Sequence, residues 1–115
     1  MVVVRAPKTD RLFHALADAT RRDIVMRTME AELSISALAR LYPMSFAAVQ
    51  KHVAVLERAR LVTKRRRGRE QLVQGNVAAI AEARRHLDRY EEMWRARIDR
   101  AGEVLKNHRE VRERR

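Results

Sequence analysis

The sequence predicts a mainly α-helical fold with about five helices and a two-stranded β-hairpin, and three observations support this. Aliphatic residues and alanine recur three and four positions apart along most of the chain, which is the spacing of a helix face. Aromatic residues make up only 4% of the 115 residues, which favours helical packing over a β-sandwich. Two short runs of β-type composition flank a turn at Gly68. A chain of this length forms one domain with a modest core, so dimerisation is a natural supplement.

The composition indicates a polyanionic partner. Lys and Arg number 26 against 15 Asp and Glu, which gives a net charge of +11. Nucleic acid is the expected partner of a domain this basic, with an anionic membrane surface or a merely solubilising charge as alternatives. The absence of cysteine excludes disulfides and thiolate chemistry. No apolar run has the length of a signal peptide or a transmembrane helix, so we expect a cytoplasmic protein with no membrane partner.

Polar caps and apolar stripes divide the first 60 residues into four helices. Residues 1–8 are expected to form a flexible N-terminal arm, and residues 9–106 the folded domain. The helices are capped in turn by Thr9, Asp18, Ser34 and Ser45. Pro43 ends the third helix, because proline disfavours helical geometry in the residue before it. Only Tyr42, Pro43 and Met44 then separate the third helix from the fourth.

Beyond the fourth helix the hydrophobic period changes. Residues 61–66 and 70–74 are predicted to pair as a β-hairpin around a turn at Gly68. Asn76 caps a long last helix, in which apolar residues seven positions apart form a stripe. The basic residues 107–115 are expected to be a disordered tail.

Two short helices joined by a three-residue turn and followed by a basic hairpin have the order of a winged helix-turn-helix. The second helix of such a pair fits the major groove of DNA, where its N-terminal residues meet base edges. Gln50 suits adenine and Lys51 suits guanine or a phosphate, although an ordinary solvated helix face is the alternative. Phe46 and His52 are as well suited to packing as to DNA contact. The expected DNA-reading residues are Ser45, Phe46, Ala47, Gln50, Lys51 and His52.

The hairpin concentrates positive charge. Five cations occupy positions 64–69, and they are Lys64, Arg65, Arg66, Arg67 and Arg69. A β-wing presents such residues to phosphates or to the narrow minor groove, so DNA affinity should fall steeply with salt. A solubilised turn is the alternative. Arg21 and Arg22 stand at the start of the second helix, where positive charge opposes the helix dipole, and this indicates a phosphate or carboxylate partner.

The last helix is expected to form the interface of a homodimer. A helix this long extends beyond a small core, and its apolar stripe would otherwise face water. Packing within the monomer is the alternative. The expected interface residues on this helix are Leu87, Tyr90, Trp94, Ile98 and Leu105. A two-fold axis would set two reading helices one DNA turn apart, roughly 34 Å, and therefore predicts an inverted-repeat operator.

Two segments of the chain follow a recurrent pattern. They are LFHALADATRRDIV and ISALARLYPMSFAAVQKHVAVLERARLVTKRRRGREQLV, which match "ALAD-TRR-I" and "LA…S…AVS-HL-VLE-AGLV…R-GR". On these motifs the chain, over residues 10–75, resembles the ArsR family of bacterial transcriptional repressors. The resemblance implies that the helix beginning at Ser45 inserts into the major groove, and that the first and last helices form the dimer interface. It thereby adds Leu12 and Phe13 of the first helix to the expected interface residues.

The chain departs from the metal-sensing members of that family. Those members carry a Cys-x-Cys within "ELCVC", where residues 32–36 here read ELSIS. Hydroxyls are poor ligands for soft metals, so sensing of arsenic, cadmium or lead by this route is not expected. A second family site uses Asp and His of the last helix, and the remaining candidate pair is Glu82 with His86, for which a surface ion pair is the alternative. We expect no metal and no cofactor, and the sequence names no inducer.

The sequence therefore predicts a sequence-specific DNA-binding transcriptional regulator and not an enzyme. We expect a repressor that binds an inverted-repeat operator as a homodimer, with its own promoter as a candidate target. An RNA-binding or architectural winged-helix protein is one alternative, and it would bind without a palindrome requirement. An enzyme is the other, and it is disfavoured because the sequence shows no nucleophile–base pair and no glycine-rich phosphate loop.

Overall fold

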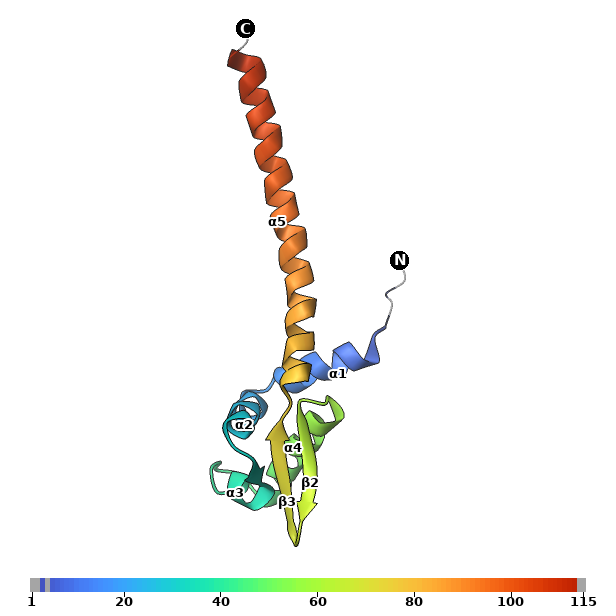
Figure 1. Cartoon of the computed structure of the whole chain (residues 1–115), viewed down its shortest axis with the longest axis vertical. Coiled ribbons are helices and arrows are strands. Elements are labelled where there is room, and N and C mark those ends of the chain that lie inside the picture. Colours follow the sequence, from blue (N-terminus) through green and yellow to red (C-terminus); the bar gives the residue numbers. More distant parts are fainter. Residues whose placement is uncertain (1–2, 4, 114–115) are drawn as a thin grey trace. The chain divides into compact units, whose positions relative to one another are not determined.

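The computed structural model describes residues 3 and 5–113 and shows five helices with one small antiparallel sheet (Figure 1). By its internal contacts the chain divides into two units, Met1–Ala83 and Arg84–Arg115. The elements of the first unit are α1 (Pro7–Leu16), α2 (Ala19–Glu30), β1 (Leu33–Ser34), α3 (Ile35–Ala39), α4 (Phe46–Arg58), β2 (Val62–Arg67) and β3 (Glu70–Gly75). Helix α5 (Val77–Glu113) begins in the first unit and provides the helix of the second.

The first helix begins earlier than the sequence predicts. It starts at Pro7, and Ala6 before it provides no side-chain capping hydrogen bond. Thr9 therefore lies inside α1, and the prediction that it caps this helix is wrong. Proline suits the first helical position because the N–H that it lacks has no partner there and its φ is already helical. The predicted N-terminal arm, 1–8, thus loses its last two residues to α1, and positions 1, 2 and 4 lie outside the described residues.

The other four predicted caps are confirmed. Asp18, Ser34, Ser45 and Asn76 each accept a hydrogen bond through the side-chain oxygen from a backbone N–H two or three residues further on. The donor–acceptor distances are 2.9–3.2 Å. Each bond satisfies an N–H that the first turn of a helix leaves unpaired. Local side-chain chemistry therefore sets where α2, α3, α4 and α5 begin.

The sheet has three strands in the order β1-β3-β2, one more than the sequence predicts. Strands β2 and β3 form the predicted hairpin, in which Arg67 is opposite Glu70 and Gly68 adopts a left-handed φ of 62° in the turn. Strand β1 pairs antiparallel with β3 through Leu33 and Ser34. A strand of two residues is too short to show an alternating pattern, so the sequence indicated only a connection there.

The core of the first unit joins the inner faces of the helices to the sheet. Its largest fully buried apolar residues are Ile24, Leu38, Val49, Val53, Leu56, Leu61, Val62 and Val73. Leu12 belongs to the same core and is only 3% exposed. It faces inward together with Ala15, one helical turn further along α1. Leu12 therefore offers almost no surface to a second subunit, and this corrects its assignment to the dimer interface.

Helix α5 ends at Glu113, within the segment 107–115 that was expected to be a disordered tail. The apolar stripe fades after Leu105, but a helix does not need an apolar stripe to continue. Residues 103–113 contain neither glycine nor proline and include many Lys, Arg and Glu, which are good helix formers. Residues 114–115 lie outside the described part of the chain. Although α5 has 37 residues, no helix among the described residues combines the length and the apolar character needed to cross a membrane.

Tyr42 anchors the segment between α3 and α4 to α2. Its hydroxyl donates a hydrogen bond to Oδ2 of Asp23 at 2.5 Å, and Nε of Arg27 donates to the same oxygen at 2.7 Å. The hydrogen bond from Tyr42, followed by that from Arg27, holds the pKa of the Asp23 carboxyl below its usual value. Burial, followed by the hydrogen bond to Asp23, raises the pKa of Tyr42 to about 12.

We expect Tyr42→Phe to raise the pKa of Asp23 towards its ordinary value. A carboxyl with a lowered folded-state pKa stabilises the fold above its unfolded pKa, and this stabilisation is lost as the pH falls through the lowered value. The free energy of unfolding should therefore fall more steeply below about pH 4 in the wild type than in Tyr42→Phe. NMR titration of Asp23 measures the pKa, and urea unfolding above and below that pH measures the stability. Tyr90→Phe is the matched control, and an Asp23 pKa that moves in neither variant would contradict the expectation.

Candidate nucleic-acid interface

Helix α4 has one buried and one open face. Its buried residues are Val49, Val53 and Leu56. The exposed positions at its start are Ser45, Phe46, Ala47, Gln50 and Lys51. Phe46 is 47% exposed, so the core does not enclose its ring. Packing against the core therefore involves only part of this side chain. The open face thus combines an aromatic ring, a small side chain, an amide and a cation, which are groups that read base edges in the major groove.

The segment before α4 is longer than the predicted three-residue turn. Helix α3 ends at Ala39, several residues before Pro43. The backbone N–H of Leu41 donates to the carbonyl of Leu38 at 3.0 Å, and that of Met44 donates to the carbonyl of Tyr42 at 2.9 Å. Pro43 disfavours helical geometry in Tyr42. One further turn would also add little stability to a helix as short as α3.

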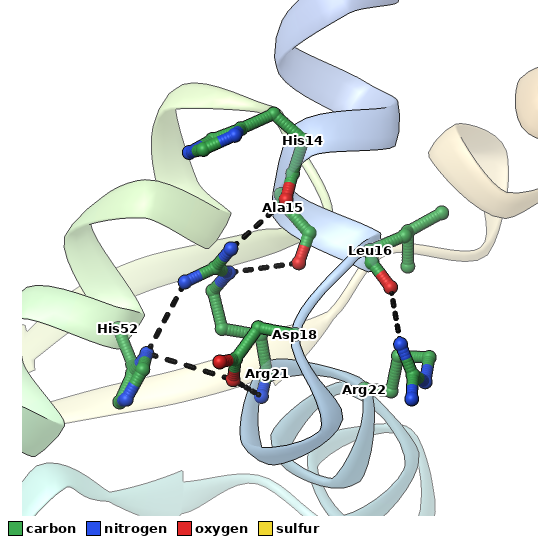
Figure 2. A network of polar contacts seen from close by, with 7 residues as sticks. All are labelled: His14, Ala15, Leu16, Asp18, Arg21, Arg22 and His52. Atoms are coloured by element: carbon green, nitrogen blue, oxygen red, sulfur yellow. Dashed lines mark hydrogen bonds and ion pairs between the residues drawn. The ribbon is translucent and has the colours of Figure 1, made fainter.

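His52 lies between α4 and the start of α2 (Figure 2). Its Nδ1 is 3.4 Å from Nη1 of Arg21 and 3.9 Å from Oδ2 of Asp18. The ring is partly buried, as the structural alternative for this residue implies. When Nδ1 accepts a hydrogen bond from Arg21, the hydrogen of the neutral ring is on Nε2. A contact between His52 and DNA stays a prediction, and Nε2 is the atom that would donate in it.

Arg21 and Arg22 close the C-terminal end of α1 (Figure 2). Nε of Arg21 donates to the carbonyl of Ala15 at 2.8 Å, and its Nη2 donates to the carbonyl of His14 at 2.9 Å. Nη1 of Arg22 donates to the carbonyl of Leu16 at 2.8 Å. These carbonyls lie in the last turn of α1, where a helix leaves carbonyls without an α-helical partner and its dipole attracts cations. The guanidinium groups of both arginines thus have carbonyl partners within the chain, and the charge of Arg21 also acts on the carboxylate of Asp18. A phosphate partner for either arginine stays a prediction.

The start of α2 is neutralised separately by its own cap. The backbone N–H of Arg21 donates to Oδ2 of Asp18 at 2.9 Å. This hydrogen bond, together with the nearby positive charge of Arg21, holds the pKa of the Asp18 carboxyl below its usual value. The carboxylate of Asp18 therefore offsets the positive charge at the start of α2.

Two of the five predicted wing cations are engaged by carboxylates of the same chain. Nζ of Lys64 lies 3.4 Å from Oε1 of Glu57. Arg65 forms a bidentate pair with Glu32, from Nε to Oε2 at 2.8 Å and from Nη2 to Oε1 at 2.6 Å. The hydrogen bonds from Arg65 hold the pKa of Glu32 below its usual value. The sequence did not predict either of these ion pairs. For Glu32 the reason is its separation of 33 positions from Arg65, which no local pattern bridges.

The other three wing cations surround the hairpin turn. Arg66 donates through Nε to the carbonyl of Gly68 at 3.1 Å. Among the described residues, no carboxylate lies within ion-pair distance of Arg66, Arg67 or Arg69. These three guanidinium groups are called the wing-tip arginines. The charge of Arg67 also contributes to the lowered pKa of Glu32, without an ion pair.

The second unit presents an apolar stripe to solvent. Its residues are each more than half exposed, and they are Leu87, Tyr90, Trp94, Ile98 and Leu105. Trp94 lies near the middle of the stripe and is 59% exposed. Ion pairs between side chains one turn apart, Arg84 with Asp88 and Arg95 with Glu91, lie elsewhere on α5. An isolated helix with such a stripe leaves a large apolar surface unpartnered.

No metal centre appears among residues 3 and 5–113. In that part of the chain no three His, Asp or Glu side chains come together in a way that would hold a metal ion. Nδ1 of His86, one of the two candidate ligands, lies 2.5 Å from Nη2 of Arg89.

A helix with an open face, a short connection before it and a basic hairpin after it define a DNA-binding transcriptional regulator of the winged helix-turn-helix class. Comparison with known proteins agrees with this class. The HTH-type transcriptional regulator Rv2034 of Mycobacterium tuberculosis is 42% identical over 90 residues, which cover 78% of this chain and 82% of the relative. No protein-family model matches the chain.

Solved structures show the same fold. The ArsR-like transcriptional regulator from Rhodococcus sp. RHA1 superposes with a TM-score of 0.80 at 29% identity, over 87% of this chain and 92% of that one. The homodimeric winged helix-turn-helix DNA-binding domain Mb0332 of Mycobacterium bovis, a possible ArsR-family regulator, superposes with a TM-score of 0.61 at 18% identity, over 79% of this chain and 92% of that domain. The chain belongs to the ArsR family of transcriptional regulators. It contains no cysteine and therefore lacks the Cys-x-Cys metal site.

Proposed function

We propose that this protein is a homodimeric repressor that binds an inverted-repeat operator, and that its own promoter region is the first operator to test. The observation that carries the proposal is the combination of an open α4 face with three wing-tip arginines that form no ion pair among the described residues. Base edges specify sequence, whereas phosphate contacts supply affinity and position. The two features thus match the two requirements of an operator-binding protein, which acts where the genome lies, in the cytoplasm.

The exposed residues of α4 have different roles in the proposed contact with DNA. Gln50 matches the donor–acceptor pair of adenine, and Lys51 matches the acceptors of guanine or a phosphate. The small side chain of Ala47 allows close approach of the helix to the groove. Phe46 is the candidate for an apolar contact with a thymine methyl group, since its ring is half exposed.

The apolar stripe of α5 supports the homodimer. Its residues Leu87 and Trp94 are seven positions apart, and Ile98 and Leu105 repeat this interval, which is the spacing of a helix that packs along a second helix. We propose that the stripe and Phe13 pack against the same residues of a second copy. The homodimeric state of the Mycobacterium bovis domain is consistent with this arrangement.

Gln50→Ala is expected to weaken operator binding about tenfold and to leave binding to a random duplex almost unchanged. The change removes a bidentate base contact, which contributes about 1–3 kcal/mol of discrimination, and it alters no charge. Gel-shift competition between the upstream DNA of the gene and a scrambled duplex, at one fixed salt concentration, measures both affinities. Gln74→Ala on β3 also removes an exposed amide and is the matched control. Equal losses on both duplexes would remove Gln50 from base readout.

The wild-type protein tests the proposal as a whole. The upstream duplex should compete better than its scrambled counterpart, and footprinting should show two symmetric protected half-sites. Inversion of one half-site should abolish the preference, because both reading helices must engage. Purified protein should lower transcription from the bound promoter. Equal competition by both duplexes would exclude a specific regulator, and a rise in transcription would exclude repression.

A further inference from the structure

A cavity of about 330 Å³ lies in the first unit, away from the start of α4 and from the wing. Its walls come from α1, from the end of α4 and from the beginning of α5. The lining residues are Lys8, Arg11, Leu12, Arg58, Ala59, Arg60 and Glu82. The volume lies at the lower end of the range of small-molecule sites, about 300–1,000 Å³.

The charge around this cavity is unbalanced. Four of the lining residues are cations and only Glu82 is anionic, which leaves a surplus of three positive charges. Within the described residues, none of the four cationic side chains has a hydrogen-bond or ion-pair partner. Lys8 also lies in the first turn of α1, where the helix dipole disfavours positive charge. These four cations are exposed to solvent and, unlike the two wing cations paired with Glu32 and Glu57, have no carboxylate partner among the described residues.

Arg60 adds an independent observation from the backbone. Its φ is 61°, and no other described residue except glycine has a positive φ. It terminates α4, with its N–H donating to the carbonyl of Glu57 at 2.9 Å and the N–H of Leu61 donating to that of Leu56 at 3.0 Å. Glycine is favoured at such a helix end because it has no Cβ to strain the left-handed geometry. Arginine at position 60 therefore does not stabilise the backbone of this helix end. The side chain of Arg60 lines the cavity.

We propose that this cavity binds a small organic anion that carries at least two negative charges, as carboxylate or phosphate groups, on a compact apolar body. The four cations would pair with the charged groups, and the apolar body would lie against the small surface that Leu12 and Ala59 expose within the cavity. Glu82 would accept a hydrogen bond from a ligand hydroxyl. The site lies at the far end of α4 from Phe46, about 18 Å away along the helix. This binding is a property of the DNA-free chain and does not rest on the proposed repressor function.

Arg60→Gly tests ligand binding without destabilising the fold, because glycine is favoured at this position. Calorimetric titration of the full-length, DNA-free protein at low salt uses phenyl phosphate and phthalate as probes, with inorganic phosphate and phenol for comparison. We expect saturable binding of one phenyl phosphate or phthalate per chain, and weaker binding of inorganic phosphate and phenol. Arg60→Gly should weaken the binding of both organic anions about tenfold, as expected for the loss of one charge-assisted contact. Its Tm without ligand should equal or exceed that of the wild type, because glycine relieves the left-handed strain.

Arg40→Gln is the matched control, since it removes an exposed cation outside the cavity. It should change the affinity for phenyl phosphate less than twofold, a difference too small to reflect a direct contact. Arg11→Gln provides a second cavity variant and should also weaken binding if Arg60→Gly destabilises the fold. The absence of saturable binding, or equal losses in Arg40→Gln and Arg60→Gly, would overturn the proposal. It would also be overturned if Arg60→Gly weakened random-duplex binding as much as phenyl phosphate binding, because the cavity would then belong to the DNA interface.

Discussion

Trp94→Ala is expected to raise the dissociation constant of the proposed homodimer about 1,000-fold. Trp94 is 59% exposed in the single chain and lies near the middle of the apolar stripe of α5. Tryptophan at the centre of an interface commonly contributes about 2 kcal/mol or more, and a two-fold axis places each such residue in the interface twice. Alanine is the strongest helix former, so α5 itself should persist in the variant.

Sedimentation equilibrium over a dilution series measures this constant directly. Met93→Ala is the matched control, because Met93 adjoins Trp94, is 71% exposed and lies outside the seven-residue spacing. We expect the control to change the dissociation constant by less than about threefold. An unchanged constant in Trp94→Ala would exclude Trp94 from the interface, and a wild-type protein that stays monomeric would exclude the homodimer.

Replacement of the three wing-tip arginines, Arg66, Arg67 and Arg69, by glutamine is expected to weaken binding to operator and random duplex alike. Each lost phosphate contact should reduce the slope of log affinity against log salt by about 0.9, and cost about fivefold in affinity at physiological salt. The triple variant should therefore bind about 100-fold more weakly, with a slope flatter by about 2.7. The ratio of operator to random-duplex affinity should stay nearly constant, because phosphate contacts carry no sequence information.

The control for net charge is a triple variant of α5, Arg85→Gln, Arg100→Gln and Lys106→Gln. It removes the same number of positive charges from exposed positions outside the apolar stripe. Fluorescence anisotropy titrations at several salt concentrations give the affinities and slopes of both variants. A slope as flat in the α5 variant as in the wing variant would show that net charge, and not contact at the wing tip, governs binding.

Most element boundaries follow from short-range chemistry. Asp18, Ser34, Ser45 and Asn76 cap the helices that they were predicted to cap, because a capping bond joins groups only two or three residues apart. The spacing of Val49 and its neighbours likewise indicated which face of α4 is buried. The boundary errors occurred where local preference is weak or the element is short: β1 has two residues, α3 has five, and α1 takes Pro7 at a position that proline tolerates.

The sequence predicted which residues make up the candidate site, but not which of them contact other residues of the same chain. Exposure of Gln50 and Lys51 follows from the buried stripe opposite them. By contrast, the sequence did not reveal that Glu32 engages Arg65 or that Arg21 contacts His52. These partners are 33 and 31 positions apart, and their contact is set only when the chain folds back on itself. The sequence also did not reveal that the guanidinium group of Arg21 closes the end of α1, because the two carbonyls belong to the preceding helix.

Local order along the chain was thus sufficient for the winged helix-turn-helix arrangement, the open face of α4 and the apolar stripe of α5, since each depends on residue spacing. Only the tertiary structure showed which cations are paired with carboxylates and which are not. It pairs Lys64 and Arg65 with glutamates, leaves the wing-tip arginines available, and gathers further cations around a cavity. Charge alone does not distinguish these groups, because the difference between a neutralised and an available arginine is the position of a carboxylate remote in sequence.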